Sequence, residues 1–345
     1  MRIGWATMGD LLPDPVTGRL LTQAERHRMV VDGAAHAEDA GFVSASVGEH
    51  HFSSYIISSP PVILAAIAER TKTLRVGTAV ALGANNDPIL LAEQYATLDL
   101  LSEGRVELVL GRGNLYEHTF EAFGQRAEDS KSMYRENVGL VVKALHEEQF
   151  DWVGEHRAPF QKFTTQPRPM QSPFPVWIGG GSSVESVEFA ATMGLPLMLP
   201  GVFGRPSTFT PLVARYKEVW DQHGHSIEQQ RIGAIAHTYV DKTSQRARAK
   251  FEPRMKVYFD WLIDLIALSS PAQTGLIQPY DHDAFTTRGP TVCGSPQQVI
   301  ERMEEWREAA ELTDYLFMCD QGGQPPEDLF DTLALAGETL LPHFM

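Results

Sequence analysis

The sequence contains few of the residues that mark the simplest functional classes. Only two of its 345 residues are cysteines, Cys293 and Cys319, so neither a disulfide framework nor a cysteine zinc site is indicated. Its 29 basic and 44 acidic residues give a net charge of -15, which argues against a nucleic-acid partner. No apolar run is long enough to span a membrane, and no secretory leader opens the chain. We therefore expect a soluble, cytoplasmic protein.

Short apolar runs that end in polar or glycine-rich turns recur along the chain. Eight of them are predicted strands, at residues 3–7, 43–47, 74–80, 105–110, 176–178, 195–199, 232–240 and 315–318. Helical patterns lie between them, and in one of these Val299, Met303, Trp306 and Ala310 recur at four-three-four spacing after Ser295. Eight strand–helix units predict an α/β fold, a closed (β/α)8 TIM barrel with insertions. An open, doubly wound sheet is the alternative.

Two segments interrupt this alternation within a single predicted domain over residues 1–345. Residues 149–174 combine aromatic residues with many prolines, and we interpret them as an excursion that forms a small hairpin. Residues 268–294 contain prolines and glycines without a clear period. Because loops of this length in compact domains are usually lids or disordered segments, we expect a mobile lid there.

A glycine-rich turn follows the predicted strand at 176–178. Gly180 and Gly181 allow backbone amides to approach an anion, and the following helix start adds unpaired N–H groups and a positive dipole end. Ser182 with Glu185 is the predicted capping box of that helix. The turn lacks the Walker lysine and the full G-x-G-x-x-G spacing, so it matches no standard nucleotide motif. An ordinary serine-capped turn accounts for the same residues.

Arg112 follows the predicted strand at 105–110, between two glycines. A guanidinium is suited to hold a phosphate through two parallel hydrogen bonds. In a barrel this strand neighbours the strand at 176–178, so the two strand ends would offer one anion site. Most barrels bind phosphate after strands seven and eight, so this placement departs from the usual one. Taken alone, Arg112 also fits a surface arginine in a tight turn.

Glu49, His50 and His51 follow the predicted strand at 43–47. Alternation along a strand end sends the two imidazoles in opposite directions, so we expect no shared metal site. One histidine that faces the barrel mouth can act as a general acid or base, because its ordinary pKa is close to neutral. The alternative is a structural histidine that holds the loop through Glu49. No nucleophile elbow or H-E-x-x-H motif supports a hydrolase or a zincin.

Several short motifs follow one another along nearly the whole chain. They are EHHF at 49–52, LRVGTA at 74–79, LDLLSEGR at 98–105, GRG at 111–113, FG at 123–124, PVWIGGG at 175–181, GLP at 194–196, GSP at 294–296 and LPH at 341–343. In this order they resemble the bacterial luciferase-like flavin monooxygenases. The resemblance implies a (β/α)8 barrel that binds FMN at its carboxyl face, commonly as a dimer.

The resemblance also implies roles for individual residues. The catalytic histidine of the family falls on His50, and its phosphate-binding arginine falls on Arg112. The flavin ring would pack near Ala79–Val80, where luciferases have an unusual cis peptide. The reactive cysteine of the light-emitting subunit aligns with Gly111, so light emission is not implied. The phosphate loop of the family falls on Gly180, Gly181, Ser182, Ser183 and Ser186.

The function implied by the resemblance is an FMN-dependent monooxygenase that oxygenates an apolar, carbonyl-containing small molecule with O2. A separate reductase would supply reduced FMN, His50 would move a proton, and the chain would form a homodimer. No metal is implied. Two alternatives stay open: a deazaflavin-dependent dehydrogenase of the same fold, and a flavin-binding protein without turnover.

Overall fold

The computed structural model describes residues 1–113, 116–273, 275 and 277–344. Eight parallel strands form a closed barrel, because β9 pairs with both β8 and β10 and so joins the two ends of the sheet. In barrel order these strands are β1 (Arg2–Thr7), β2 (Ser44–Val47), β3 (Arg75–Thr78), β5 (Val106–Gly111), β8 (Val176–Gly179), β9 (Leu197–Leu199), β10 (Ile232–Val240) and β12 (Asp314–Met318). The predicted (β/α)8 barrel is confirmed, and the open-sheet alternative is wrong.

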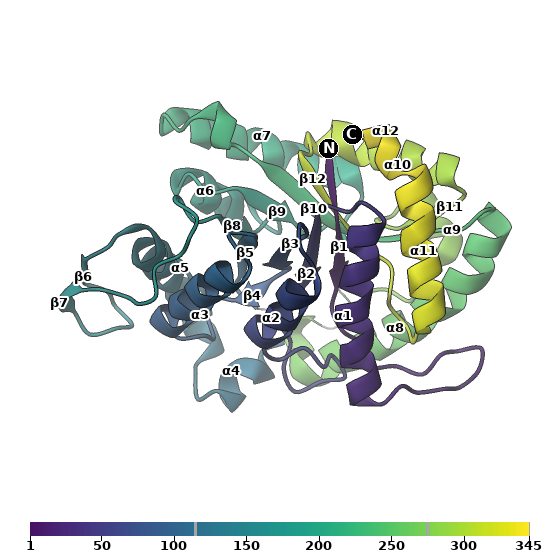
Figure 1. The fold of residues 1–345 in the computed structure, drawn as a ribbon, viewed down its shortest axis with the longest axis horizontal. Helices are drawn as coiled ribbons and strands as arrows, with labels where there is room; N and C mark the ends of the chain where they lie inside the picture. Colours follow the sequence, from purple (N-terminus) through teal and green to yellow (C-terminus); the bar gives the residue numbers. More distant parts are fainter. Residues whose placement is uncertain (114–115, 274, 276, 345) are drawn as a thin grey trace.

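Helices cover the outside of the barrel (Figure 1). The long ones are α1 (Gln23–Asp39), α2 (Pro60–Arg70), α3 (Pro88–Leu101), α5 (Ser130–His146), α6 (Val184–Thr192), α7 (Pro206–Gln222), α8 (Ser244–Ser269), α10 (Pro296–Ala310) and α11 (Pro326–Thr339). The short helix α4 (His118–Ala122) follows β5, and the short helix α12 (Leu341–Phe344) lies beside the amino terminus (Figure 1). The buried residues of α10 are Val299, Met303, Trp306 and Ala310, which confirms the face predicted from their spacing. None of the described helices is long and apolar enough to cross a membrane.

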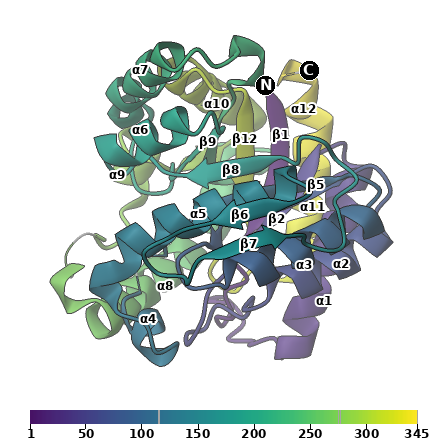
Figure 2. The same cartoon turned by 90° about the vertical axis from the view of Figure 1, so that its left-hand side faces the viewer.

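The predicted excursion between α5 and β8 is an antiparallel hairpin of β6 (Phe150–Trp152) and β7 (Phe160–Phe163). It lies beyond α5, outside the barrel, in both views (Figures 1 and 2). The segment at 268–294 has more regular structure than its lack of period predicted. It contains α9 (His282–Thr287) and β11 (Val292–Gly294), and β11 extends the sheet by pairing with the end of β10. Residues 274 and 276 of this segment lie outside the described residues.

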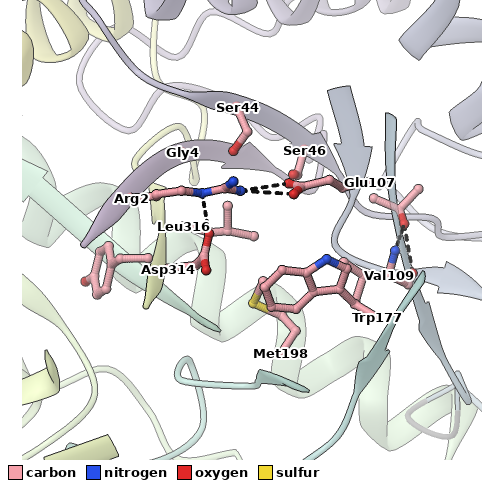
Figure 3. Close-up of a pocket in the computed structure, with 12 residues that line it drawn as sticks. Arg2, Gly4, Ser44, Ser46, Glu107, Val109, Trp177, Met198, Asp314 and Leu316 are labelled. Atoms are coloured by element: carbon pink, nitrogen blue, oxygen red, sulfur yellow. Dashed lines mark hydrogen bonds and ion pairs between the residues drawn. The ribbon is translucent and has the colours of Figure 1, made fainter. Parts of the chain in front are cut away.

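Ion pairs close the amino-terminal end of the barrel (Figure 3). Asp314 accepts from Arg2 Nε at 2.9 Å and from Arg231 Nη2 at 2.6 Å, while Glu107 lies 3.2 Å from Arg75 Nε. The Arg231 guanidinium lies over the Trp177 ring at 4.4 Å. The remaining cavity measures about 20 Å³, which is room for about one water molecule. This end of a barrel contributes stability, and the opposite end carries the candidate site.

Candidate active site

The predicted site residues follow four strands that are adjacent in the barrel. His50 follows β2, Ala79 follows β3, Arg112 follows β5 and Gly180 follows β8, and the strand order is β2-β3-β5-β8. Because all four strands are parallel, these residues gather at the carboxyl-terminal edge, where barrel enzymes build their active sites. The expectation that Arg112 and the glycine-rich turn follow neighbouring strands is confirmed by the direct pairing of β5 with β8.

The segment after β3 contacts the carboxyl-terminal ends of β2, β5 and β8. The Ala79–Val80 peptide bond is cis, as the resemblance implied. The Val80 carbonyl accepts from the Glu49 backbone N–H at 2.9 Å, and the chain then continues as β4 (Ala81–Leu82) against β5. A Cβ on Gly111 or Gly179 would lie 2.3 or 2.8 Å from a methyl group of Val80. Both strand ends therefore need glycine to let Val80 approach.

The glycine-rich turn leads into α6, but its cap differs from the prediction. Ser183, not Ser182, is the N-cap: its hydroxyl accepts from the Ser186 backbone N–H at 3.3 Å, and its backbone is extended, as an N-cap requires. Glu185 forms an ion pair with Lys131 instead of completing a capping box. The Ser186 hydroxyl donates to the Ser183 carbonyl at 2.7 Å and accepts from the Gly181 amide at 3.0 Å. The five predicted loop residues thus form one turn.

The amides that this turn offers to an anion are not those of its glycines. Gly180 N–H donates to the Met198 carbonyl at 3.0 Å, and Gly181 N–H is held by Ser186. Within the described contacts, the backbone N–H groups of residues 182–185 have no protein acceptor, and these residues are exposed. Gly181 has a φ of +110°, and a Cβ there would lie 2.7 Å from Leu199. The glycines therefore shape the turn, while the helix start presents the donors.

Arg112 lies beside this turn and forms no ion pair with a carboxylate among the described residues, although Glu117 lines the same cavity. Burial lowers its pKa from the ordinary value, and no carboxylate opposes that shift among the residues that the structure places. Its half-buried side chain lines a cavity of about 140 Å³ together with Ser130. The next residue, Lys131, pairs with Glu185 in the first turn of α6. The first turn of α5 therefore joins the Arg112 cavity to the serine turn. Sequence reasoning missed Lys131, which has no motif of its own.

The two adjacent histidines have different partners. His51 Nε2 lies 2.9 Å from Glu49 Oε1, and Glu49 Oε2 accepts from the Leu82 backbone N–H at 2.8 Å. The structural histidine that Glu49 holds is thus His51, and His50 is left for another role. The His50 ring stacks on Tyr55 with centroids 4.0 Å apart, and its buried Nδ1 has no hydrogen-bond partner in the described structure.

The surroundings of His50 change its acid–base properties from those expected. Burial, with a smaller contribution from His51, lowers the pKa of His50 to about 3. The imidazole is therefore neutral near pH 7, where it can accept a proton or a hydrogen bond but is not a standing acid. The sequence-based expectation used the ordinary pKa of an exposed histidine. His50 is buried among aromatic rings, so that pKa does not apply to it.

A buried ion cluster lies beside this loop at the ends of β1 and β12. Asp320 Oδ2 accepts from Arg26 at 2.7 Å and from the Thr7 hydroxyl at 2.5 Å. Asp10 lies 3.8 Å from the same guanidinium and accepts from the Gly322 backbone N–H at 2.8 Å. Burial raises the pKa of Asp10 to about 6, although Arg26 opposes the shift. These residues carry no sequence motif. The fold brings Arg26 and Thr7 to Asp320, from which they are 294 and 313 positions apart in the sequence.

Comparisons with known proteins agree with this geometry. The profile of the luciferase-like monooxygenases matches residues 1–311. The chain belongs to the luciferase-like monooxygenase family, a family of oxidoreductases. It is 27% identical over 323 residues to the oxygenase component of flavin-dependent trigonelline monooxygenase from Acinetobacter baylyi, which covers 87% of this chain and 85% of that protein.

Solved structures share this fold over their whole length. The crystal structure of monooxygenase RslO1 from Streptomyces bottropensis has a TM-score of 0.87 and 23% identity, with all of both chains covered. The coenzyme F420-dependent tetrahydromethanopterin reductase of Methanopyrus kandleri has a TM-score of 0.74 and 18% identity, also over all of both chains. At these identities the likeness concerns the fold alone.

Proposed function

We propose that this protein is the oxygenase component of a flavin monooxygenase that receives reduced FMN from a separate reductase. The proposed reaction oxygenates an apolar, carbonyl-containing small molecule with O2. The observation that carries the proposal is the half-buried Arg112, which forms no ion pair among the described residues, beside four donor amides on the next strand end. Membership of the family and the similarity to a relative named as an oxygenase component support it.

The residues present fit the phosphate and the ring of a flavin. Arg112 would hold the phosphate with the amides of residues 182–185, and the hydroxyls of Ser182 and Ser183 are exposed at the same turn. Ala79 presents a small side chain at the strand-three position where the flavin ring packs in the family. Bound reduced flavin supplies the reducing equivalents and the reaction with dioxygen.

The chain itself supplies position, a proton acceptor and exclusion of water. His50, neutral and with an unpartnered Nδ1, would accept the proton or hydrogen bond that the reaction releases at the barrel mouth. The segment at 268–294 would cover the mouth as a lid and keep water from reactive species. We place this reaction in the cytoplasm.

We also propose that the chain forms a homodimer through α2 and α3. These neighbouring helices expose large apolar side chains, Val62 at 71%, Leu90 at 54% and Leu101 at 53%. Exposed apolar side chains on two adjacent helices suit contact with a second copy. Sedimentation equilibrium would give twice the chain mass, and a purely monomeric protein at micromolar concentration would refute the interface.

The site is tested by titrating FMN, in reduced and oxidised form, into wild type and Arg112→Ala. Loss of a charge-assisted pair typically costs about 1.5–3 kcal/mol, so the variant should bind reduced FMN about ten- to a hundredfold more weakly. Arg126→Ala is the matched control, because Arg126 is exposed and pairs with Glu128 outside the cavity. Equal FMN affinity in wild type and Arg112→Ala would contradict the assignment.

A parallel titration with a reduced deazaflavin tests the dehydrogenase alternative. Tighter binding of the deazaflavin than of FMN, together with substrate turnover that needs no oxygen, would replace the proposed function. Oxygen uptake that depends on reduced FMN supports the monooxygenase, and tight FMN binding without any turnover supports the non-catalytic alternative.

A further inference from the structure

A pair of tyrosine hydroxyls lies next to His50 and takes no part in the function proposed so far. The Tyr55 and Tyr258 hydroxyl oxygens are 2.6 Å apart, and each side chain is 4% exposed. Tyr55 belongs to the loop after β2. Two backbone hydrogen bonds, from Leu11 to Ser54 and from Ile56 to Gly9, fix its position against the segment that follows β1. Tyr258 belongs to α8, so the pair joins segments 203 residues apart.

Counting hydrogens shows that this pair and the neighbouring Tyr116 have one more donor than they use. Two phenols carry two hydroxyl hydrogens, and their mutual hydrogen bond uses one. The Tyr116 hydroxyl also bonds to that of Tyr55 and brings a third hydrogen. Two mutual hydrogen bonds then use two of three hydrogens, so one hydrogen is left without an acceptor among the contacts of the described residues. The pKa of both phenols lies well above the ordinary value, mainly because both are buried. The pair therefore stays protonated and able to donate. A buried donor without an acceptor favours a ligand that brings one.

The groups around the pair define the chemistry of that ligand. The Tyr55 ring stacks on His50, and the Tyr258 ring meets the edge of His237 at 5.5 Å. The Nδ1 atoms of both imidazoles are buried without a hydrogen-bond partner in the described structure. Trp261 packs on Tyr55 at 4.7 Å. The donor is therefore surrounded by aromatic rings and neutral imidazoles, a setting for an apolar molecule with one polar atom.

The nearby charges disfavour an anionic ligand. Asp10 and Asp320 contribute to the raised pKa of Tyr258, so the hydroxyl pair lies in the field of two carboxylates. One guanidinium, that of Arg26, compensates them. An oxygen with a full negative charge would be repelled, whereas a neutral carbonyl oxygen accepts a hydrogen bond without that cost.

We propose that the Tyr55–Tyr258 hydroxyl pair donates a hydrogen bond to the neutral carbonyl oxygen of the substrate. The inference rests on the proposed function for the presence of a substrate at this end of the barrel, and it adds the group that orients that substrate beside His50. The hydrogen bond also polarises the carbonyl, which makes its carbon more electrophilic. His237 contacts the Tyr258 ring edge-on, with centroids 5.5 Å apart.

The test uses ligand-detected NMR on the full chain, with and without FMN. The probes are 2-octanone, cyclooctanone and octanal, each beside the hydrocarbon in which CH2 replaces the carbonyl group. Tyr258→Phe and Tyr55→Phe each keep the ring and remove one hydroxyl. Tyr216→Phe is the matched control, because Tyr216 is a buried tyrosine whose hydroxyl donates to the Leu195 carbonyl elsewhere in the fold.

Wild type should bind at least one carbonyl probe more tightly than its hydrocarbon. Tyr258→Phe should weaken binding of that probe about three- to tenfold and leave the hydrocarbon unaffected, and Tyr216→Phe should change neither. No preference of wild type for the carbonyl, or equal carbonyl affinity in wild type and both single variants, overturns the proposal even where FMN binds. An intact carbonyl preference in a protein that fails to bind FMN would instead refute the flavin function and leave the tyrosine pair standing.

Discussion

His237 is a buried titratable group whose protonation opposes folding in acid. Its side chain is 2% exposed on β10, and its Nδ1 has no hydrogen-bond partner in the described structure. Burial lowers its pKa to about 4, and Gln321 opposes the shift only in part. An exposed histidine in the unfolded chain has a pKa of about 6.5. Because the folded state holds the proton more weakly, the free energy of unfolding falls as pH drops through the interval from about 6.5 to about 4.

The size of this effect follows from the two pKa values. Each pH unit between them changes the free energy of unfolding by about 1.4 kcal/mol, so lowering the pH from about 7 to about 5 should cost about 2 kcal/mol through His237 alone. His237→Gln has no proton to gain and should lack that part of the pH dependence. Asp10 and His50 titrate in or below the same range, but both proteins keep them, so their contributions cancel in the comparison.

Urea denaturation of wild type and His237→Gln at three pH values between about 5 and 7 measures the difference. We compare the free energy of unfolding of wild type minus that of His237→Gln. This difference should fall by about 2 kcal/mol from the highest pH to the lowest, whatever its value at neutral pH. His223→Gln, at an exposed position, is the control and should keep the wild-type dependence. The same pH dependence in wild type and His237→Gln would refute the reasoning.

Three further predictions concern the candidate site. His50→Ala should lower substrate turnover per bound FMN by about 10²–10⁴-fold and keep flavin affinity; near-wild-type turnover by folded variant would exclude a catalytic role. Gly181→Ala should lower the melting temperature and weaken FMN binding, because its Cβ would lie 2.7 Å from Leu199; Gly224→Ala, also at positive φ but in open space, is the control. Protease cleavage within 268–294 should slow when reduced FMN is present, and equal cleavage rates would count against a lid.

The barrel was predictable because its signals are local. Each of the eight strands is a short apolar run, and the structure places a strand within one or two residues of most predicted boundaries. The predicted strand at 74–80 is shorter in the structure, because pairing stops at Thr78 and resumes on β5 at Ala81. α1 begins with a capping box of Thr22 and Glu25, which is another local signal.

The parts of the site that sequence reasoning missed depend on contacts between distant segments. The partner of Glu49 is His51 and not His50, which depends on how the loop folds back on Leu82. The Tyr55–Tyr258 pair has a separation of 203 residues and no motif at either end. Serine occupies both 182 and 183, so composition alone does not say which adopts the extended N-cap backbone. The roles of His50, Arg112 and the loop residues stay predictions until they are tested.

Buried polar groups without partners at the carboxyl-terminal end of the barrel support the placement of the chemistry. At the amino-terminal end, Asp314 and Glu107 each have a guanidinium within 3.2 Å, although the buried Trp177 Nε1 there has no hydrogen-bond partner among the described residues. At the carboxyl-terminal end, Arg112 has no compensating carboxylate in the described structure, and the Nδ1 atoms of His50 and His237 have no partner there. An unpaired buried polar group costs about 1–3 kcal/mol, and selection for stability alone would remove it. Several polar groups without partners at the carboxyl-terminal end of the barrel are expected if a ligand supplies their partners when it binds.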